Sequence, residues 1–197
     1  MEEFTPESLC QIHAFLFEDI YEWAGKYRII NIEKREELLA GRSVWYSNDE
    51  NIPHDLETAF SVIREKRWDN FSKAEFVHEL ARCFSKVWQV QPFREGNTRT
   101  VVMMLTLFVE SHGFYMDQEL LATSAGYVRN SFVMASLDQF SEYEHLERIL
   151  MDAVCDEPIE YDVETLAVEH PANERSEKYK KYQTDDYVPQ PHYMREN

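Results

Sequence analysis

The sequence is poor in cysteine, and the few cysteines it has argue against a disulfide-linked or zinc-binding protein. Cys10, Cys83 and Cys155 are odd in number, widely spaced and each next to apolar residues. Such cysteines are typical of buried, reduced thiols rather than of a disulfide framework or a metal site. We therefore expect a protein from a reducing compartment.

Positive charge is scarce as well. The chain has 20 Lys and Arg against 37 Asp and Glu, which gives a formal net charge of -17. The field of such a surface repels both nucleic acid and anionic membranes. We expect no nucleic-acid partner and no membrane partner.

Long apolar runs and several well-known catalytic motifs are missing too. No run reaches the roughly 18 to 20 residues that a membrane-spanning helix needs, and Met1-Glu2-Glu3 lacks the positive charges that open a secretory signal. The sequence has no Walker-type phosphate loop, no zinc-type cluster of Cys and His, and no Gly-x-Ser-x-Gly nucleophile elbow. We expect a cytoplasmic protein, and delivery into another cell without a cleaved signal is the alternative.

What the sequence does have is helical periodicity, with enough apolar residues for one core. A helix is predicted from Pro6 to near Gly25 by the spacing of Leu9, Ile12, Leu16, Ile20 and Trp23. Further helices are predicted to begin at Pro53 and behind Ser72, and shorter ones to fill residues 117–153. Residues 101–109 are apolar almost all round, which predicts a helix at the centre of the bundle.

Two short segments indicate strands instead. Residues 27–32 and 43–47 carry the alternation and the β-branched and aromatic residues of a small hairpin. The predicted fold class is therefore all-α, a helical bundle with one β-hairpin. We expect one domain over residues 1–155 and an acidic, proline-containing extension over residues 156–197, whose tyrosines are expected to be exposed: Tyr161, Tyr179, Tyr182, Tyr187 and Tyr193.

The most informative segment lies between two predicted helices and reads Gln91-Pro92-Phe93-Arg94-Glu95-Gly96-Asn97-Thr98-Arg99. The first N–H groups of the following helix have no partner within that helix, so they attract anions. Glu95 offers oxygen to Mg²⁺, while Asn97 and Arg99 offer N–H groups to phosphate. These residue types together predict a phosphate-binding site. The structural alternative is that Asn97 caps the helix, Glu95 complements its dipole and Arg99 is merely solvated.

This segment resembles the signature of Fic-domain proteins, His-x-Phe-x-(Asp/Glu)-Gly-Asn-x-Arg, and the chain around it, about residues 5–150, is similar to that family. Residues 16–25 are similar to its helix ahead of the motif, and residues 27–47 lie where its hairpin "flap" lies. The resemblance implies transfer of AMP from Mg-ATP to a hydroxyl of a target protein, with release of pyrophosphate. UMP, phosphocholine and phosphate are the groups that some relatives transfer instead.

Carried over by residue, the resemblance implies that Glu95 holds Mg²⁺ and that Gly96, Asn97, Thr98 and Arg99 bind the nucleotide. Phe93 would anchor the loop in the core. The family's histidine, which takes the proton from the attacking hydroxyl, falls on Gln91.

A carboxamide cannot accept that proton, so we expect a slow or silent enzyme. Natural divergence and an introduced substitution both explain Gln91, and a compensating base elsewhere is a third alternative. His78, the nearest histidine, is thirteen residues upstream on the preceding predicted helix and is a poor substitute. A non-catalytic module that binds a nucleotide or a partner remains the alternative function.

Two further departures concern phosphate contact and inhibition. Thr98 stands where many members have Gly, and Val102 where they have a second arginine. That arginine contacts the terminal phosphate or pairs with the glutamate of an inhibitory helix in this family. Residues 165–169 and 61–65 match the spacing of such a helix, and we attribute both matches to chance.

The resemblance also suggests partners. The flap would dock an extended target segment along Ile29, Ile30, Asn31 and Ile32, placing a Ser, Thr or Tyr hydroxyl in line with the phosphate. The structural alternative is a hairpin that only covers the bundle. An inhibitory helix or antitoxin and a second copy of the chain are the other partners to expect.

Overall fold

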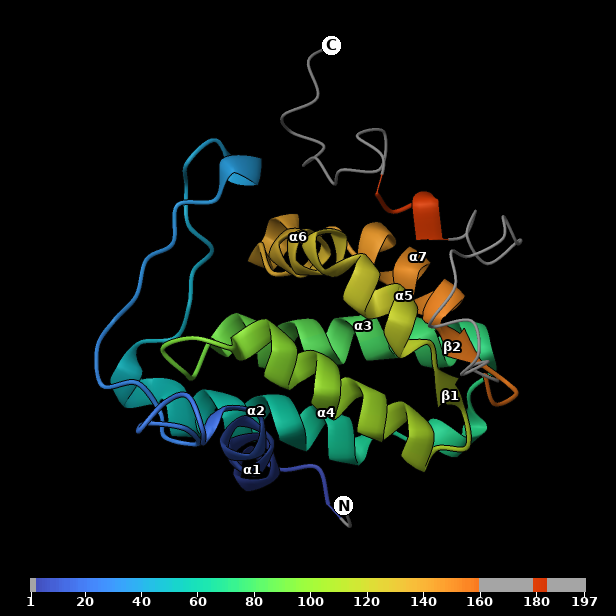
Figure 1. The fold of residues 1–197 in the computed structure, drawn as a ribbon, viewed down its shortest axis with the longest axis horizontal. Helices are drawn as coiled ribbons and strands as arrows, with labels where there is room; N and C mark the ends of the chain where they lie inside the picture. Colours follow the sequence, from blue (N-terminus) through green and yellow to red (C-terminus); the bar gives the residue numbers. More distant parts are fainter. Residues whose placement is uncertain (1–2, 160–178, 184–197) are drawn as a thin grey trace.

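The computed structural model describes residues 3–159 and 179–183, and it shows a helical bundle with very little sheet (Figure 1). Its α-helices are α1 Pro6–Phe17, α2 Ile52–Glu65, α3 Lys73–Val90, α4 Asn97–Ser111, α5 Gln118–Thr123, α6 Ala125–Ala135 and α7 Glu144–Ala153. Single 3-10 turns are η1 Glu37–Leu39, η2 Asp49–Asn51, η3 Trp68–Asn70 and η4 Asp138–Phe140. The strands β1 Tyr115–Met116 and β2 Val154–Cys155 pair antiparallel. The predicted all-α class is confirmed.

The helices begin where local side chains can cap them. The Thr5 side chain accepts a hydrogen bond from the backbone N–H of Ser8 at the start of α1, and Ser72 does the same for Glu75 at the start of α3. In both cases the third helical residue bonds back to the cap, which satisfies two otherwise unpaired N–H groups. The two predicted helix starts follow from this local chemistry.

The centre of the bundle is α3, which packs against α2, α4, α6 and α7 (Figure 1). Its large side chains Phe76, Phe84 and Trp88 are buried. The prediction that α4 would be enclosed on all sides is wrong in part, because Val102 and Met103 are only half-buried. Both line a cavity beside α4, so apolar residues on that face do not signal a central position.

Helix α1 is shorter than predicted, because it ends at Phe17 rather than near Gly25. The N–H groups of Ile20 and Tyr21 both bond to the carbonyl oxygen of Phe17, and tight turns follow as far as Gly25. The helical spacing of apolar residues continues to Trp23, although the helix ends at Phe17. Trp23 packs against the core from a turn rather than from a helix face.

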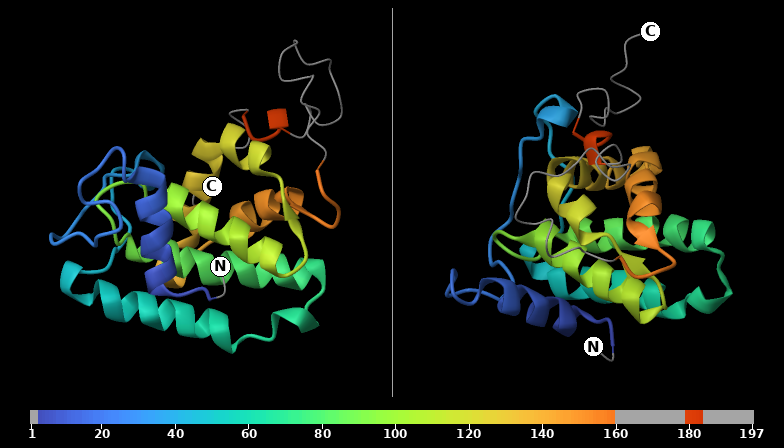
Figure 2. Two further views of the ribbon diagram at one scale, coloured as in Figure 1. Left: turned by 60° about the horizontal axis from the view of Figure 1, so that its bottom comes forward. Right: turned by 45° about the vertical axis from the view of Figure 1, so that its right-hand side comes forward.

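Residues 27–47, called the flap below, leave the bundle beside α1 and rise to the level of α6 (Figures 1 and 2). The two strands predicted here are not formed, and the only pairing in this segment is the single antiparallel bridge between Glu36 and Arg42. The reason is Arg28, whose guanidinium donates to the carbonyl oxygens of Ile30 and Ser47. A side chain thus takes the carbonyls that a β-ladder would have used.

The tip of the flap is fastened to α6 by an ion pair. Arg129 Nη2 lies 2.8 Å from both carboxylate oxygens of Glu36. The Glu36 side chain is 5% exposed, and the Tyr46 hydroxyl donates a further hydrogen bond to it over 3.2 Å. Buried carboxylates need such partners, so the pair fixes where the flap tip lies.

The expectation that the tail tyrosines are exposed is wrong for Tyr182. Its side chain is buried, its ring lies 4.8 Å from that of Tyr127, and its hydroxyl donates to Asp152 Oδ2 over 2.6 Å. Tyr179 also contacts the domain, through a 3.1 Å hydrogen bond to Asp117 Oδ1. Residues 179–183 are therefore part of the folded unit. The other tail tyrosines and residues 165–169 lie outside the described residues, and the boundary at residue 155 stays a prediction.

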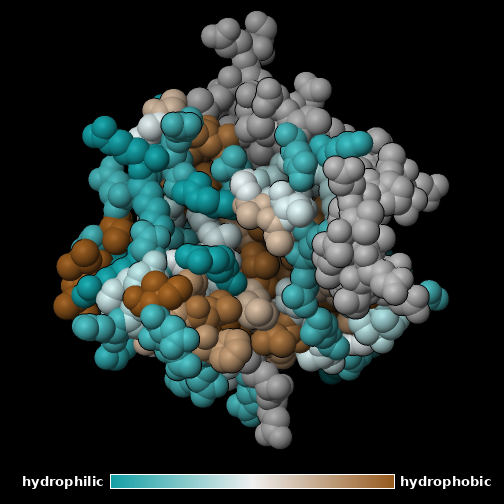
Figure 3. All heavy atoms as spheres, in the orientation of Figure 1, coloured by the Kyte–Doolittle hydropathy of each residue, from teal (hydrophilic) through white to brown (hydrophobic). Residues whose placement is uncertain are grey.

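Apolar side chains also reach the surface on the side of the flap, where hydrophobic patches interrupt the hydrophilic surface (Figure 3). The most exposed of the described large apolar side chains are Trp45, Phe15, Ile29, Ile20, Phe140 and Ile30. Within the described ranges, no helix combines the length and the apolar character that crossing a bilayer requires.

Candidate active site

The predicted motif forms a tight turn between α3 and α4. Gln91 caps the C-terminal end of α3 and Gly96 precedes α4, and both residues have left-handed backbones, with φ of 48° and 79°. Gly96 is required for a second reason: a Cβ there would lie 2.5 Å from the Phe17 ring. The glycine thus allows α1 to pack against the start of α4.

Asn97 holds this turn together from within. Its side-chain Oδ1 accepts a hydrogen bond from the Phe93 N–H over 2.9 Å, and its Nδ2 donates to the Phe93 carbonyl over 2.8 Å. Phe93 is fully buried, as the resemblance implied for a core anchor. The Asn97 amide therefore shapes the turn, and its predicted contact with phosphate stays a prediction.

His13 on α1 supports the turn from the other side, a role that the sequence analysis missed. Its Nδ1 accepts the N–H of Gly25 over 2.9 Å, so its Nε2 carries the proton and donates to the Glu95 carbonyl over 3.1 Å. The ring stacks on Phe93 with centroids 3.8 Å apart. Burial lowers the pKa of His13, which keeps the imidazole neutral and preserves both hydrogen bonds.

Gln91 is buried, and both ends of its carboxamide are bonded. Nε2 donates to the Trp88 carbonyl over 3.0 Å, and Oε1 accepts from Lys34 Nζ over 2.9 Å. Lys34 comes from the flap, and burial lowers its pKa while the nearby Glu95 charge raises it. Residue 91, where the family has its proton acceptor, is thus bonded to a lysine of the flap.

Arg28 fixes the root of the flap against the same turn. It is 1% exposed, and its Nε donates to the Gln91 carbonyl over 2.8 Å. Other N–H groups of the same guanidinium bond to carbonyls of both limbs of the flap. One buried cation therefore positions Lys34's segment relative to Gln91.

The start of α4 carries backbone donors and an arginine. Gly96 supplies no side-chain cap, so the first N–H groups of α4 have no acceptor within the helix. The Thr98 hydroxyl accepts a hydrogen bond from Trp88 Nε1 over 2.9 Å, which ties this residue to α3. Arg99 is exposed, and its guanidinium lies 4.6 Å from the centre of the Phe17 ring.

Four cations surround the turn without carboxylate partners: Arg28, Lys34, Arg94 and Arg99. Arg28 donates to backbone carbonyls, and Lys34 donates to the Gln91 amide. Arg94 lies over the Trp23 ring and Arg99 over the Phe17 ring. In the part of the chain that the structure describes, none of them forms an ion pair. Some cations elsewhere are paired, as in Lys66–Glu79, Arg129–Glu36 and Lys181–Asp152. Others among the described residues, Lys26, Arg35, Arg42 and Arg67, are exposed and also form no ion pair. What distinguishes the turn is that four such cations gather at it in a chain of net charge -17, which favours an anion there.

Glu95 fits the magnesium role that the resemblance implies. Its side chain is exposed beside the start of α4, and no cation of the described residues pairs with it. The described residues contain no group of three or more His, Cys, Asp and Glu side chains that would hold a metal alone. A single carboxylate suits Mg²⁺ when phosphate oxygens and water complete its coordination.

An apolar cavity of about 280 Å³ adjoins Arg99. It lies between α1, α4, α5 and α6, and Val102, Met103, Leu121 and Val128 contribute to its walls. Val102 thus forms part of an apolar wall where the resemblance places a second arginine. A flat aromatic group attached to a phosphate chain would suit such a cavity.

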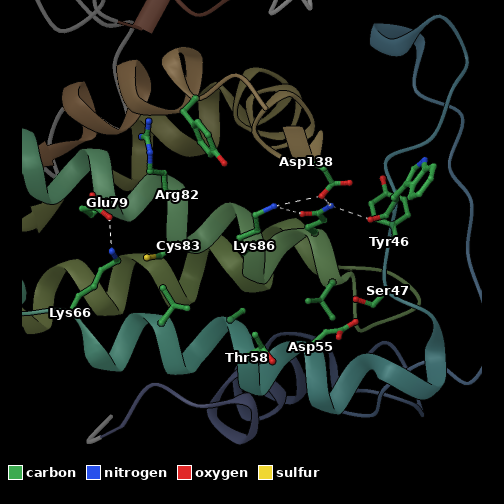
Figure 4. Close-up of a pocket in the computed structure, with 16 residues that line it drawn as sticks. Tyr46, Ser47, Asp55, Thr58, Lys66, Glu79, Arg82, Cys83, Lys86 and Asp138 are labelled. Carbon is green, nitrogen blue, oxygen red and sulfur yellow. Dashed lines mark hydrogen bonds and ion pairs between the residues drawn. The ribbon is translucent and has the colours of Figure 1, made fainter. Parts of the chain in front are cut away.

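A separate groove of about 610 Å³ lies between α2 and α3, where residues 45–47 of the flap close one end (Figure 4). None of the residues of the 91–99 turn lines it. Its charged side chains neutralise one another, as in Lys66–Glu79 at 2.7 Å and Lys86–Asp138 at 3.7 Å. The groove is therefore a poorer anion site than the turn.

The structure brings together most of the predicted site, but not all of it. Gln91, Glu95, Gly96, Asn97 and Arg99 share one turn, with Thr98 behind it. Ile29 and Ile30 are exposed at the flap, whereas Ile32 is half-buried and Asn31 accepts the Asp49 N–H over 2.9 Å. His78 lies on α3 and contacts Glu147 over 3.1 Å, which agrees with its dismissal as a base. The unforeseen members are His13, Arg28 and Lys34.

Comparison with known proteins identifies relatives of this turn and its bundle. The model of the Fic/DOC family matches residues 3–109. The probable protein adenylyltransferase y4lH of Sinorhizobium fredii is 30% identical over 112 residues, which are 56% of this chain and 55% of that protein. Protein adenylyltransferase VbhT of Bartonella schoenbuchensis is 29% identical over 142 residues, 68% of this chain and 28% of that protein. The chain thus spans about half the length of the first relative and less than a third of the second.

Solved structures of Bartonella effectors have the same fold. BepC from Bartonella tribocorum, with bound AMPPNP, has a TM-score of 0.66 at 20% identity, covering 80% of this chain and 78% of that one. The N-terminal Fic domain of an effector from Bartonella quintana, with bound ADP, has a TM-score of 0.62 at 22% identity, covering 78% and 74%. At such identities the likeness establishes the fold alone.

Proposed function

The chain belongs to the Fic/DOC family, and we propose that it is a protein adenylyltransferase that binds Mg-ATP at the 91–99 turn and reacts slowly. One observation carries this proposal: the cations around the start of α4 contact uncharged groups rather than carboxylates. They are Arg28, Lys34, Arg94 and Arg99. The naming of its relatives as protein adenylyltransferases supports the reaction. The AMPPNP and ADP bound to structural neighbours support the choice of nucleotide.

In this proposal each residue of the turn has a separate task. The backbone N–H groups at Gly96 and Asn97 contact a phosphate, and Arg99 binds another through its guanidinium. Glu95 holds Mg²⁺, which would neutralise phosphate charge when bound. The apolar cavity beside Arg99 takes the base of the nucleotide.

The chemical step is an in-line displacement. The hydroxyl oxygen of a Ser, Thr or Tyr of the target attacks the α-phosphorus, the bond to the bridging oxygen breaks, and pyrophosphate leaves. The hydroxyl proton needs an acceptor, and the Gln91 carboxamide is not basic enough to be one. Loss of a general base lowers the rate by about 10² to 10⁴, so binding and positioning survive while turnover is slow.

The target would dock on the flap, where Ile29 and Ile30 offer exposed apolar side chains beside the turn. Because no strand is formed there, apolar contact rather than strand addition is the mode that fits the flap. A cytoplasmic target, an inhibitory helix or antitoxin, and a second copy of the chain belong to the same proposal.

The second candidate function is a non-catalytic module that senses a nucleotide. The observation that favours it is the bonding of Gln91 at both ends of its carboxamide, to the Trp88 carbonyl and to Lys34, which gives this non-basic residue a structural role. Phosphate binding is common to both functions, so only a test of transfer separates them.

The test restores the family's histidine. Gln91→His protein incubated with labelled ATP, Mg²⁺ and a cell lysate should label a target about 10² to 10⁴ times faster than the original chain. The matched control is Gln91→His with Glu95→Gln, which should bind Mg-ATP poorly and transfer no label. Mass spectrometry of the labelled protein identifies the added group.

Two outcomes contradict the first proposal. Nucleotide binding without any transfer by the folded Gln91→His protein favours the sensor module. Absence of Mg-ATP binding in calorimetry, with the fold intact, excludes a nucleotide site and leaves only capture of a partner.

A further inference from the structure

The flap places a lysine ammonium against the turn where the proton acceptor of the family would lie. Lys34 Nζ is 2.9 Å from Gln91 Oε1, and the two residues are 57 positions apart in the chain. Gln91 is held in turn by its hydrogen bond to the Trp88 carbonyl. The ammonium is therefore anchored to α3 through a rigid amide.

Lys34 is anchored without being neutralised. No carboxylate among the described residues forms an ion pair with it, although its own segment is rich in acids. The nearest buried acid along the flap is Glu36, and its carboxylate is paired with Arg129 instead. An amide oxygen fixes the position of an ammonium group but leaves its full positive charge available.

The surroundings of Lys34 favour an anion over water. The side chain is half-buried, Arg28 contributes a second cation at the Gln91 carbonyl, and no acid is directly paired with either. Two positive charges on one side of a turn repel each other in a medium of reduced polarity, and a bound phosphate relieves that repulsion. The opposing influences are the charges of Glu95 and Glu36. Glu36 is paired with Arg129, and Mg²⁺ would engage Glu95 in the proposed complex.

We propose that Lys34 is a further phosphate-binding residue of this site and that Gln91 is its positioning residue. This inference rests on the proposed nucleotide-binding function and adds a ligand from outside the motif. In it, residue 91 has exchanged one task for another: it presents a cation of the flap to the triphosphate instead of accepting a proton. The binding of ATP and the placement of the flap are then coupled through one hydrogen bond.

Calorimetric titration with Mg-ATP and with adenosine tests the inference. Lys34→Gln removes the charge but keeps a polar side chain that can still bond to Gln91. It should weaken Mg-ATP binding about tenfold or more, while adenosine binding stays unchanged because adenosine has no phosphate. Lys34→Arg should restore most of the affinity. The matched control is Lys26→Met, in the exposed turn ahead of the flap, which should bind both ligands as the original chain does.

Gln91→Leu tests the positioning role. It should lower Mg-ATP affinity when Lys34 is present and have little further effect in Lys34→Gln protein, because the charge that Gln91 positions is then already absent. A purely structural role for Lys34 predicts a different result, namely equal losses for Mg-ATP and adenosine.

The outcomes separate this inference from the proposed function. If the original chain binds Mg-ATP and Lys34→Gln binds it equally well, Lys34 is not a phosphate ligand and the inference alone fails. If the original chain binds no Mg-ATP, the proposed function fails and the inference fails with it.

Discussion

His13 and Glu95 are 82 positions apart in the chain, yet the ring Nε2 of His13 lies 3.1 Å from the Glu95 carbonyl oxygen. The other ring nitrogen accepts the Gly25 N–H. One neutral imidazole thus connects α1, the turns that follow it and the loop that carries the candidate metal ligand. Its protonation would remove an acceptor and place a charge in the core.

We predict that His13 makes the stability of the fold depend on pH. Burial lowers its pKa below the ordinary value of 6.5, so the unfolded chain binds a proton more readily than the folded one. The stability that His13 contributes is complete above pH 6.5 and is lost as the pH falls from there through the folded-state pKa. The slope is at most about 1.4 kcal/mol per pH unit.

Chemical denaturation of the original chain and of His13→Ala between pH 8 and pH 5 measures this effect. His13→Ala should lower the free energy of unfolding by about 2 to 4 kcal/mol at pH 8, and the difference should narrow toward pH 5. His54→Ala, at an exposed position of α2, is the control and should leave the free energy of unfolding unchanged at each pH. A constant difference at every pH would rule out this role.

Gly96→Ala should destabilise the turn and abolish nucleotide binding. The added Cβ meets the Phe17 ring at 2.5 Å and the backbone φ of 79° is unfavourable for alanine, so we expect a loss of about 2 kcal/mol or more. Gly126→Ala in α6 is the matched control, because outside its own helix turn the added Cβ meets nothing within 4 Å. It should stabilise the protein by about 0.5 to 1 kcal/mol. Thermal melting and Mg-ATP titration compare the two, and equal effects would contradict the packing argument.

Arg129→Met should release the flap from α6. The substitution leaves the buried Glu36 carboxylate with the Tyr46 hydroxyl in place of an ion pair, and the flap has no β-ladder of its own to retain it. We expect amide hydrogen exchange in residues 27–47 to accelerate on the order of tenfold. Arg64→Met, which removes the exposed pair with Glu57, should not change it. Unchanged flap exchange in Arg129→Met would show that Arg28 and Lys34 hold the flap without this ion pair.

Tyr182→Phe tests whether residues 179–183 stabilise the domain. The hydroxyl that it removes bonds to Asp152 Oδ2 over 2.6 Å and to the Arg148 carbonyl over 3.2 Å. The loss should be about 1 to 3 kcal/mol, because a carboxylate in a half-buried position loses a donor. Tyr115→Phe, at a partly exposed position of β1, is the control and should cost little. An equal and small effect of both substitutions would mean that the Tyr182 hydroxyl contributes nothing to the stability of the fold.

Much of the fold followed from local chemistry that the sequence contains. The caps Thr5 and Ser72, and the glycine and amide of the 91–99 turn, act on neighbours within a few residues. Such interactions have fixed sequence spacing, so their pattern predicted the starts of α1 and α3 and the class of the bundle. One exception is the flap, where the Arg28 side chain bonds to carbonyls that a strand would have used.

The supporting residues of the site had no such signal. In the sequence, His13 looks like any histidine on an amphipathic helix, and Arg28 looks like any arginine after a turn. Lys34 is one of several charged residues in a run. Each acts on a residue 57 or more positions away. His13 bonds to the Glu95 carbonyl, Arg28 to the Gln91 carbonyl and Lys34 to the Gln91 side chain. The sequence by itself determined which residues form the turn and that its chemistry suits phosphate, because those properties lie within nine adjacent residues. Only the tertiary structure decided which distant side chains hold the turn and that Gln91 binds a lysine, because packing alone brings α1, the flap and α3 together.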